Sequence, residues 1–155
     1  MAVVALTSLA VGGCASYQGS TLSSQLVSWN KTTSFWSQIG TVVHDAQQVT
    51  TARREGDQAG VRDLCMVLSN DTRGAYQLLP SPDKTLSAGL NQALQLEETA
   101  AGDCFKGASG DTSLAATADG ERDRAAVALG AACEIYQRAV GSAPATPCWD
   151  SGGGG

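Results

Sequence analysis

Apolar residues recur at steps of three and four along most of the chain, which is the spacing of an amphipathic helix. The first such segment covers residues 21–55 without a proline, and only polar threonines at 32–33 interrupt it. It closes with Arg53 and Arg54, where the helix dipole favours cations, and with Gly56, which suits a left-handed cap. The pattern predicts one long helix. Its apolar face carries Leu22, Leu26, Trp29, Trp36, Ile39, Val43 and Ala46, with Val27, Phe35, Val42 and Val49 alongside.

Three further segments with the same periodicity follow, over residues 57–79, 82–106 and 111–141. Pro80 ends the first of them, because a proline cannot continue a helix. The links between segments are short, so consecutive helices are expected to be antiparallel neighbours. Four amphipathic helices joined in this way predict an all-α, antiparallel four-helix bundle.

Polar residues mark where these helices are expected to begin. Asp57, Ser81 and Asp111 each stand at the start of a periodic segment and can accept a hydrogen bond from its first turn. Gly120 lies inside the last segment, where glycine costs about 1 kcal/mol relative to alanine. It is therefore a candidate for a break or kink in the fourth helix.

The first sixteen residues bear on where the protein resides. An apolar run leads into Val11-Gly12-Gly13-Cys14, which resembles the end of a bacterial lipoprotein signal. We expect residues 1–13 to be a signal peptide, Cys14 to carry a lipid at the outer face of the membrane, and residues 14–20 to be a tether. The basic residues that usually open a signal peptide are missing, which a start codon chosen too far downstream would explain. An ordinary cleaved signal with an incidental Cys14, and thus a secreted protein, is the alternative.

Charge and composition narrow the range of partners. The chain has 155 residues, the size of one domain, and a net charge of −5. It has no basic stripe, so we expect no nucleic acid partner and no electrostatic binding to anionic lipid. Aromatic residues make up only 5%, which suits close helix packing better than a β-sandwich. Two prolines and a final glycine run predict a non-helical tail over residues 142–155, so the bundle is expected to cover residues 21–141.

Four cysteines besides Cys14 allow three disulfide pairings in an oxidising compartment. At 1.5 Å rise per residue, Cys65 lies about 12 Å above the start of its helix, and Cys104 lies within a few ångströms of that start. Cys133 lies about 30 Å up, which excludes Cys104–Cys133, and Cys104–Cys148 would be badly stretched. The expected set is Cys65–Cys104 and Cys133–Cys148. The first pair still needs a shift of several ångströms, from helix tilt or different helix ends.

A resemblance appears over roughly residues 60–112. It is carried by Cys65, Leu78-Leu79-Pro80-Ser81-Pro82-Asp83, Leu90-Asn91-Gln92-Ala93-Leu94 and Cys104-Phe105-Lys106-Gly107. This run is similar to a segment of uncharacterised actinobacterial exported proteins and lipoproteins, in which two helices joined by an L-P-x-P-D turn lie between two cysteines. The resemblance implies a helical hairpin stapled by Cys65 and Cys104, and it supplies no catalytic residue.

Reactive residues are scattered along the chain. His44, the only histidine, is followed by Asp45, but neighbouring helical residues point about 100° apart and do not face each other. The carboxylates at Glu97 and Asp103 lack the Glu-x-x-His motif of a di-iron bundle. The run Glu121-Arg122-Asp123-Arg124 alternates in sign and is interpreted as a solvated helix face. We therefore expect no catalytic residue, no metal and no cofactor.

Trp29, Phe35 and Trp36 form the richest aromatic cluster, and most of it is expected to fill the core. Two apolar stripes lie side by side on their helix, which leaves more apolar surface than three neighbouring helices can cover. This surplus could meet a partner protein or a lipid, with Trp29 and Trp36 as the anchors, because aromatic residues dominate interfaces.

These patterns lead to three hypotheses. The first is a non-enzymatic, membrane-tethered bundle that acts as an accessory or interaction subunit at the outer cell envelope. The alternative is a carrier that holds a small apolar ligand or lipid between helices, where the Ala- and Gly-rich faces of the third and fourth helices leave room. The third is an enzyme whose site no motif reveals.

Overall fold

A computed structural model describes residues 21–142, and these residues form five helices. The predicted signal peptide, Cys14, the tether, Cys148 and nearly all of the predicted tail lie outside the described residues. The helices are α1 (Leu22–Thr33), α2 (Phe35–Glu55), α3 (Gln58–Tyr76), α4 (Lys84–Ala108) and α5 (Ser113–Val140).

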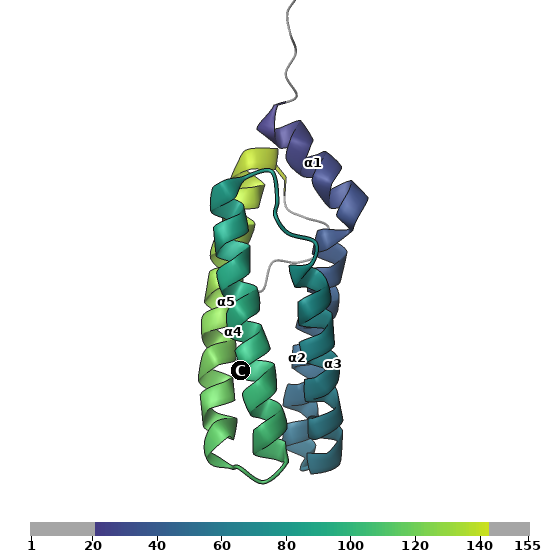
Figure 1. The fold of residues 1–155 in the computed structure, drawn as a ribbon, viewed down its shortest axis with the longest axis vertical. Coiled ribbons are helices and arrows are strands. Elements are labelled where there is room, and N and C mark those ends of the chain that lie inside the picture. The colour runs from purple at the N-terminus through teal and green to yellow at the C-terminus, as the bar shows by residue number, and fades with distance from the viewer. Residues whose placement is uncertain (1–20, 143–155) are drawn as a thin grey trace, which may run out of the picture.

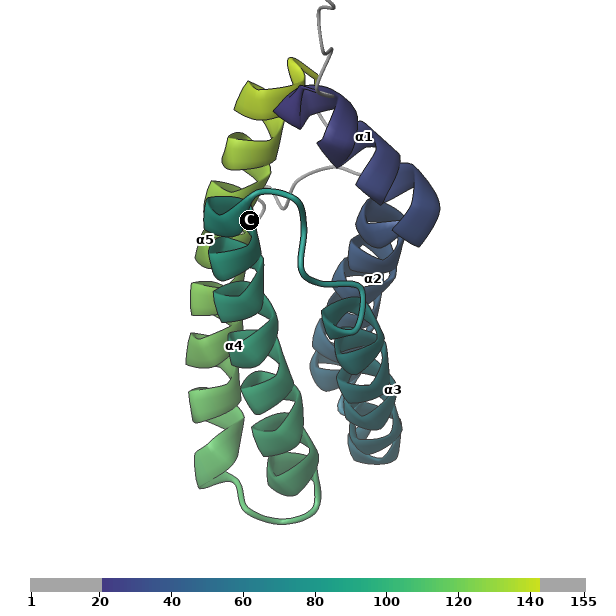
Figure 2. The same ribbon diagram turned by 45° about the horizontal axis from the view of Figure 1, so that its top comes forward.

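Each of the four longer helices runs antiparallel to the next along the chain, and together they make an elongated bundle (Figure 1). α2 and α3 form one hairpin, and α4 and α5 form the other, with their turns at the same end of the molecule. α1 crosses the opposite end and reaches from the start of α2 to the end of α5 (Figure 2). The predicted all-α, antiparallel four-helix bundle is confirmed, with α1 as an additional helix.

The prediction of one helix over residues 21–55 is wrong, because the chain breaks at Ser34. Ser34 adopts the left-handed conformation, with φ 56° and ψ 30°, and ends α1 by donating its N–H to the Asn30 carbonyl oxygen. The Asn30 side chain then accepts a hydrogen bond from the Trp36 N–H at 3.0 Å, and the Thr33 hydroxyl bonds the Trp29 carbonyl oxygen. Short polar side chains thus compete with the helical ladder where the apolar stripe is interrupted.

The ends of the other helices also differ from expectation in places. Asp57 caps α3 as predicted, since its carboxylate accepts from the Gly60 N–H. Asp83 caps α4 in place of Ser81, since its carboxylate accepts a hydrogen bond from the Leu86 N–H. Ser81 is buried, and its hydroxyl forms a hydrogen bond with the Ser87 hydroxyl. Thr112, which makes no side-chain cap bond, stands in place of Asp111 before α5.

Gly120 does not break α5, which continues to Val140. A single glycine in a helix of this length costs about 1 kcal/mol, which the packing of the helix outweighs. The predicted break is therefore absent from this helix.

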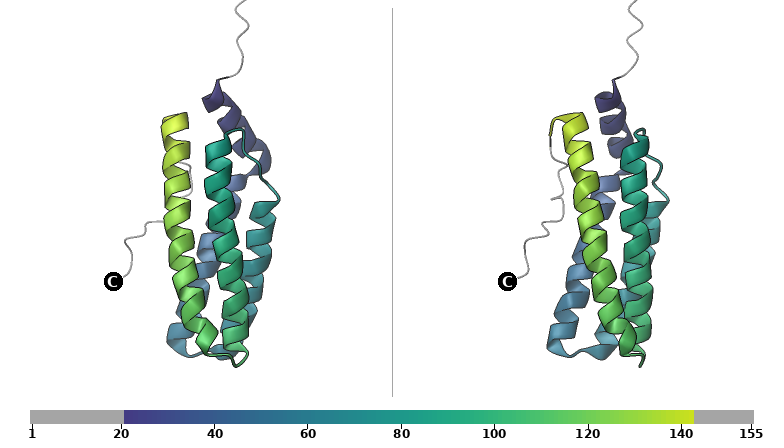
Figure 3. Two further views of the ribbon diagram at one scale, coloured as in Figure 1. Left: turned by 60° about the vertical axis from the view of Figure 1, so that its left-hand side comes forward. Right: turned by 90° about the vertical axis from the view of Figure 1, so that its left-hand side faces the viewer.

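The packing of the bundle is tight on one side and wide on another. α4 and α5 lie close along their whole length, as the side views show, and a Cβ atom added at Gly89 would lie 3.3 Å from the Ala132 Cβ (Figure 3). No Cα atom of α2 comes within 8 Å of a Cα atom of α5. We call the space between these two helices the α2–α5 seam. Only long side chains can join helices at that spacing.

Candidate functional site

A disulfide joins the two hairpins of the bundle. Cys65 on α3 and Cys104 on α4 are bonded, with their Cα atoms 6.0 Å apart, and neither side chain is exposed. α4 continues to Ala108, two residues past its expected end, which raises Cys104 by about 3 Å and reduces the mismatch in height with Cys65. The predicted Cys65–Cys104 pair is confirmed. Cys133 is buried on α5, and its expected partner Cys148 lies outside the described residues.

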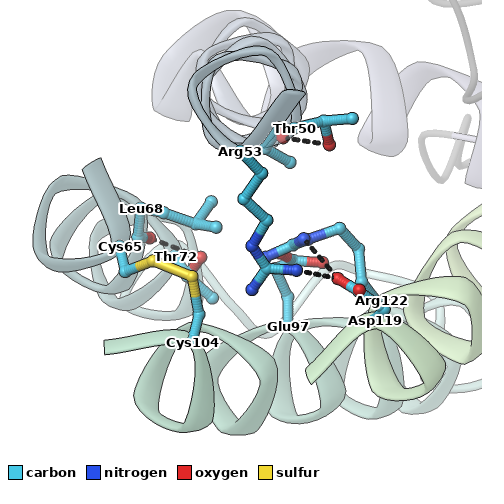
Figure 4. A network of polar contacts seen from close by, with 10 residues as sticks. Thr50, Arg53, Cys65, Leu68, Thr72, Glu97, Cys104, Asp119 and Arg122 are labelled. Atoms are coloured by element: carbon cyan, nitrogen blue, oxygen red, sulfur yellow. Dashed lines mark hydrogen bonds and ion pairs between the residues drawn. A yellow bond between two sulfur atoms is a disulfide. The ribbon is translucent and has the colours of Figure 1, made fainter. Parts of the chain in front are cut away.

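A group of charged side chains lies beside this disulfide, inside the bundle (Figure 4). It consists of Arg53 from the last turn of α2, Glu97 from α4, and Asp119 and Arg122 from α5. We call these four residues the charge layer. They come from three helices and meet where α2 faces the α4–α5 pair.

Two guanidinium groups share one carboxylate oxygen in the charge layer. Arg53 Nη1 donates to Asp119 Oδ1, and Arg122 Nη1 lies 3.6 Å from the same oxygen. Arg122 also donates from Nε to Glu97 Oε1 at 3.3 Å. The Arg53–Asp119 contact spans the α2–α5 seam, so this ion pair holds the two hairpins together on their open side.

The charge layer leaves several buried polar atoms without a partner among the described residues. They are Arg53 Nη2, Arg122 Nη2 and Glu97 Oε2. Glu97 and Arg122 are only 3% and 7% exposed, so bulk water does not replace the missing bonds. Burial raises the pKa of the Glu97 carboxyl, and the neighbouring Arg122 opposes that rise. The layer therefore contains two buried donors and one buried acceptor whose hydrogen bonds no described residue completes.

The expectation that residues 121–124 form a solvated face is wrong for Arg122. Its position explains why, since Arg122 lies four residues after Ala118 and three before Ala125, both of which are buried. Glu97 likewise follows the buried Leu94 by three residues. The helical spacing of Arg122 and Glu97 relative to buried residues was the signal for their burial. The alternating charges of residues 121–124 instead suggested a solvated face.

His44 and Asp45 point to different environments, as their spacing predicts. His44 is exposed, while Asp45 is buried and interacts electrostatically with Asp71 on α3. Burial is the main cause that raises the pKa of Asp45 to about 6, and the neighbouring Asp71 is the second. His44 opposes this shift. The two acids form a carboxyl pair that sequence reasoning missed.

The aromatic cluster lies at the other end of the α2–α5 seam. Trp36 is 2% exposed and packs edge-on against Phe35 and against Tyr136 of α5, with ring centroids 5.5 and 5.2 Å apart. Trp29 is half-buried and donates from Nε1 to the Leu78 carbonyl oxygen at 3.2 Å. Trp36 thus belongs to the core in this chain, and Trp29 fastens α1 to the link between α3 and α4.

α1 is the least buried helix of the described chain. Leu26 is the one buried residue of α1. The side chains of Leu22 and Val27 are 41% and 47% exposed. The exposed apolar side chains of the first segment are therefore on α1, at Leu22 and Val27.

Among residues 21–142, no group of three or more His, Cys, Asp or Glu side chains is arranged to hold a metal ion. None of the five described helices has the length and apolarity needed to cross a membrane.

No protein-family model, curated protein or solved structure matches the chain. The resemblance to actinobacterial exported proteins accordingly stays a prediction.

Proposed function

We propose that this chain is a non-enzymatic helical bundle, tethered to the outer face of the cell membrane by a lipid on Cys14, that serves as an accessory or interaction subunit of the envelope. The observation that carries the proposal is the buried Cys65–Cys104 disulfide. Disulfides persist in oxidising compartments, so this bond fits an exported protein. The lipoprotein-like sequence before Cys14 fits the same compartment.

α1 is the element that we assign to partner contact. Six residues separate Cys14 from Thr21, so a lipid on Cys14 would keep α1 within roughly 25 Å of the membrane. The exposed Leu22 and Val27 would then face other envelope proteins at that level. Trp29 holds α1 in place for this contact, because its Nε1 atom donates a hydrogen bond to the Leu78 carbonyl oxygen.

The tether is tested by fractionating cells that produce the full chain. We expect the wild-type protein in the membrane fraction, carrying a metabolically incorporated lipid label, and the Cys14→Ser variant in the soluble fraction without label. Ser16→Ala is the matched control, since it changes a neighbouring residue and keeps the cysteine. A Cys14→Ser protein that stays with the membrane would refute the tether.

The partner contact is tested by mild crosslinking and recovery of a tagged full chain. We expect one or two envelope proteins to be recovered in near-stoichiometric amounts, and to be lost from a Leu22→Asp/Val27→Asp double variant. Val127→Asp is the control, because Val127 is an exposed apolar residue on α5, at 66%. Equal recovery by both variants would remove α1 from the contact.

The carrier remains the second candidate, and the α2–α5 seam is the observation that favours it. Its helices stand farther apart than the other neighbouring pairs, and the buried Trp36 Nε1 has no partner among the described residues. Organic extraction of the purified protein, followed by mass spectrometry, should release a bound lipid or apolar molecule. An extract identical to a buffer blank would contradict this candidate.

A further inference from the structure

We propose that the charge layer is a binding site for an oxyanion, a carboxylate or phosphate group that accepts hydrogen bonds from Arg53 and Arg122 inside the bundle. This inference rests on the charge layer alone and does not depend on the tether or on α1.

The first argument is the presence of two guanidinium donors without a partner. Arg53 Nη2 and Arg122 Nη2 are both buried without a partner among the described residues, and a buried unpaired donor costs about 1–3 kcal/mol. Their Nη1 atoms share one acceptor, Asp119 Oδ1, so Asp119 cannot give each guanidinium a full pair of bonds. A second oxyanion would supply the missing acceptors, because guanidinium groups bind carboxylates and phosphates through two parallel bonds.

The second argument is the burial of the Arg122 guanidinium. Arg122 faces both Glu97 and Asp119, yet its Nη2 atom has no partner among the described residues. Burial raises the pKa of the Glu97 carboxyl, and Arg122 opposes that rise. Two carboxylate oxygens nearby, Glu97 Oε2 and Glu121 Oε2, are buried without a partner as well, and Glu121 Oε1 is directed to Arg124, at 3.7 Å.

The third argument is access. Figure 4 shows both guanidinium groups between α2 and the α4–α5 pair, with Asp119 at their outer side. The Asp119 side chain is 58% exposed and that of Arg53 is 21% exposed, whereas that of Arg122 is 9% exposed. Exposure in the charge layer therefore decreases along the α2–α5 seam, from the Asp119 carboxylate to the Arg122 guanidinium. An anion entering beside Asp119 meets Arg53 first and Arg122 behind it.

The bound carboxylate or phosphate group can belong to a free small anion or to the head group of an amphiphile whose apolar chain lies in the α2–α5 seam. The test is isothermal titration calorimetry on the full chain in non-ionic detergent, with the disulfide intact. The probes are inorganic phosphate, acetate and octanoate, of which the last two carry the same carboxylate. Octanoate binding about tenfold tighter than acetate identifies an amphiphile, and equal affinities identify a free anion.

Arg53→Gln and Arg54→Gln are the variants to compare. Both remove one positive charge from the last turn of α2, but Arg54 is exposed and lies outside the charge layer. We expect Arg53→Gln to raise the Kd of the best probe about tenfold and Arg54→Gln to change it less than about twofold. Arg53→Lys keeps the positive charge but loses the two parallel N–H donors of the guanidinium, so it should weaken binding as well. It replaces Arg53→Gln if that variant does not fold.

Two results would overturn the site. One is the absence of binding heat with all three probes at roughly 10 mM, which would mean that water alone fills the layer. The other is an equal loss of affinity in Arg53→Gln and Arg54→Gln, which would mean that the anions bind the general surface charge.

Discussion

Arg122 on α5 donates from Nε to Oε1 of Glu97 on α4 across 3.3 Å, and both side chains are less than a tenth exposed. A buried ion pair loses much of its attraction to desolvation, but removing one partner leaves an uncompensated charge in the interior. The loss of one partner should therefore destabilise the fold more than the loss of both.

Arg122→Met is expected to lower the free energy of unfolding by about 3–5 kcal/mol, because it leaves Glu97 buried without its cation. The Glu97→Met/Arg122→Met double variant should recover most of that loss, since it removes both charges. Urea unfolding measures both effects. Arg138→Met is the control, because the Arg138–Glu134 pair is exposed, and it should cost less than about 1 kcal/mol. A double variant as unstable as the single one would contradict this account.

Gly89 and Gly102 on α4 should respond in opposite directions to a larger side chain. A Cβ atom at Gly89 already meets the Ala132 Cβ at 3.3 Å, so Gly89→Leu forces α4 and α5 apart and should cost about 1–3 kcal/mol. A Cβ atom at Gly102 meets nothing within 4 Å, and Gly102→Ala should stabilise by up to about 1 kcal/mol. Thermal unfolding followed by circular dichroism separates them. Two changes of the same sign would show that the α4–α5 spacing is not set by Gly89.

The break between α1 and α2 makes Ser34 a position that prefers glycine. Its φ of 56° is costly for a residue with a Cβ atom, so Ser34→Gly should stabilise by about 0.5–1 kcal/mol. Ser37, an exposed position in the first turn of α2, is the matched control, because Ser37→Gly should destabilise by a similar amount. Chemical denaturation of the two variants gives the comparison. A loss of stability in Ser34→Gly would mean that the chain does not turn left-handed there.

The Asp45–Asp71 pair should give the protein an acid-dependent stability. The pKa of Asp45 is raised from 3.8 to about 6 in the folded chain, so the folded state binds the proton more tightly than the unfolded state does. Stability from this group is fully present below pH 3.8 and is lost as the pH rises through about 6.

Asp45→Asn removes that dependence and should stabilise the protein at pH 7.5 by about 1–2 kcal/mol, with a difference that vanishes near pH 4. Urea unfolding at several pH values measures this difference. Asp63→Asn on α3, where the side chain is 69% exposed, should stay within about 0.5 kcal/mol throughout. A stabilisation by Asp45→Asn that is the same at pH 4 and pH 7.5 would contradict the raised pKa.

The sequence was most informative about apolar periodicity and least informative about charge. Leu86, Leu90 and Leu94 repeat at helical spacing and are all buried, so the inward face of α4 was readable directly. Arg122 has the same spacing relative to its buried neighbours, yet its charge suggested solvent. Whether a charged residue at an inward position is buried depends on a partner, and Glu97 lies 25 residues away.

Helix content, the antiparallel order and the Cys65–Cys104 pair followed from the sequence by itself, because burial periodicity, short links and helical rise are local quantities. The break at Ser34 was visible only as an interruption of the stripe, since its left-handed geometry depends on which side chain bonds which carbonyl. The tertiary structure alone decided the charge layer and the α2–α5 seam. Arg53, Glu97 and Asp119 are separated by tens of residues, and only the packing of α2 against the α4–α5 pair brings their charges together.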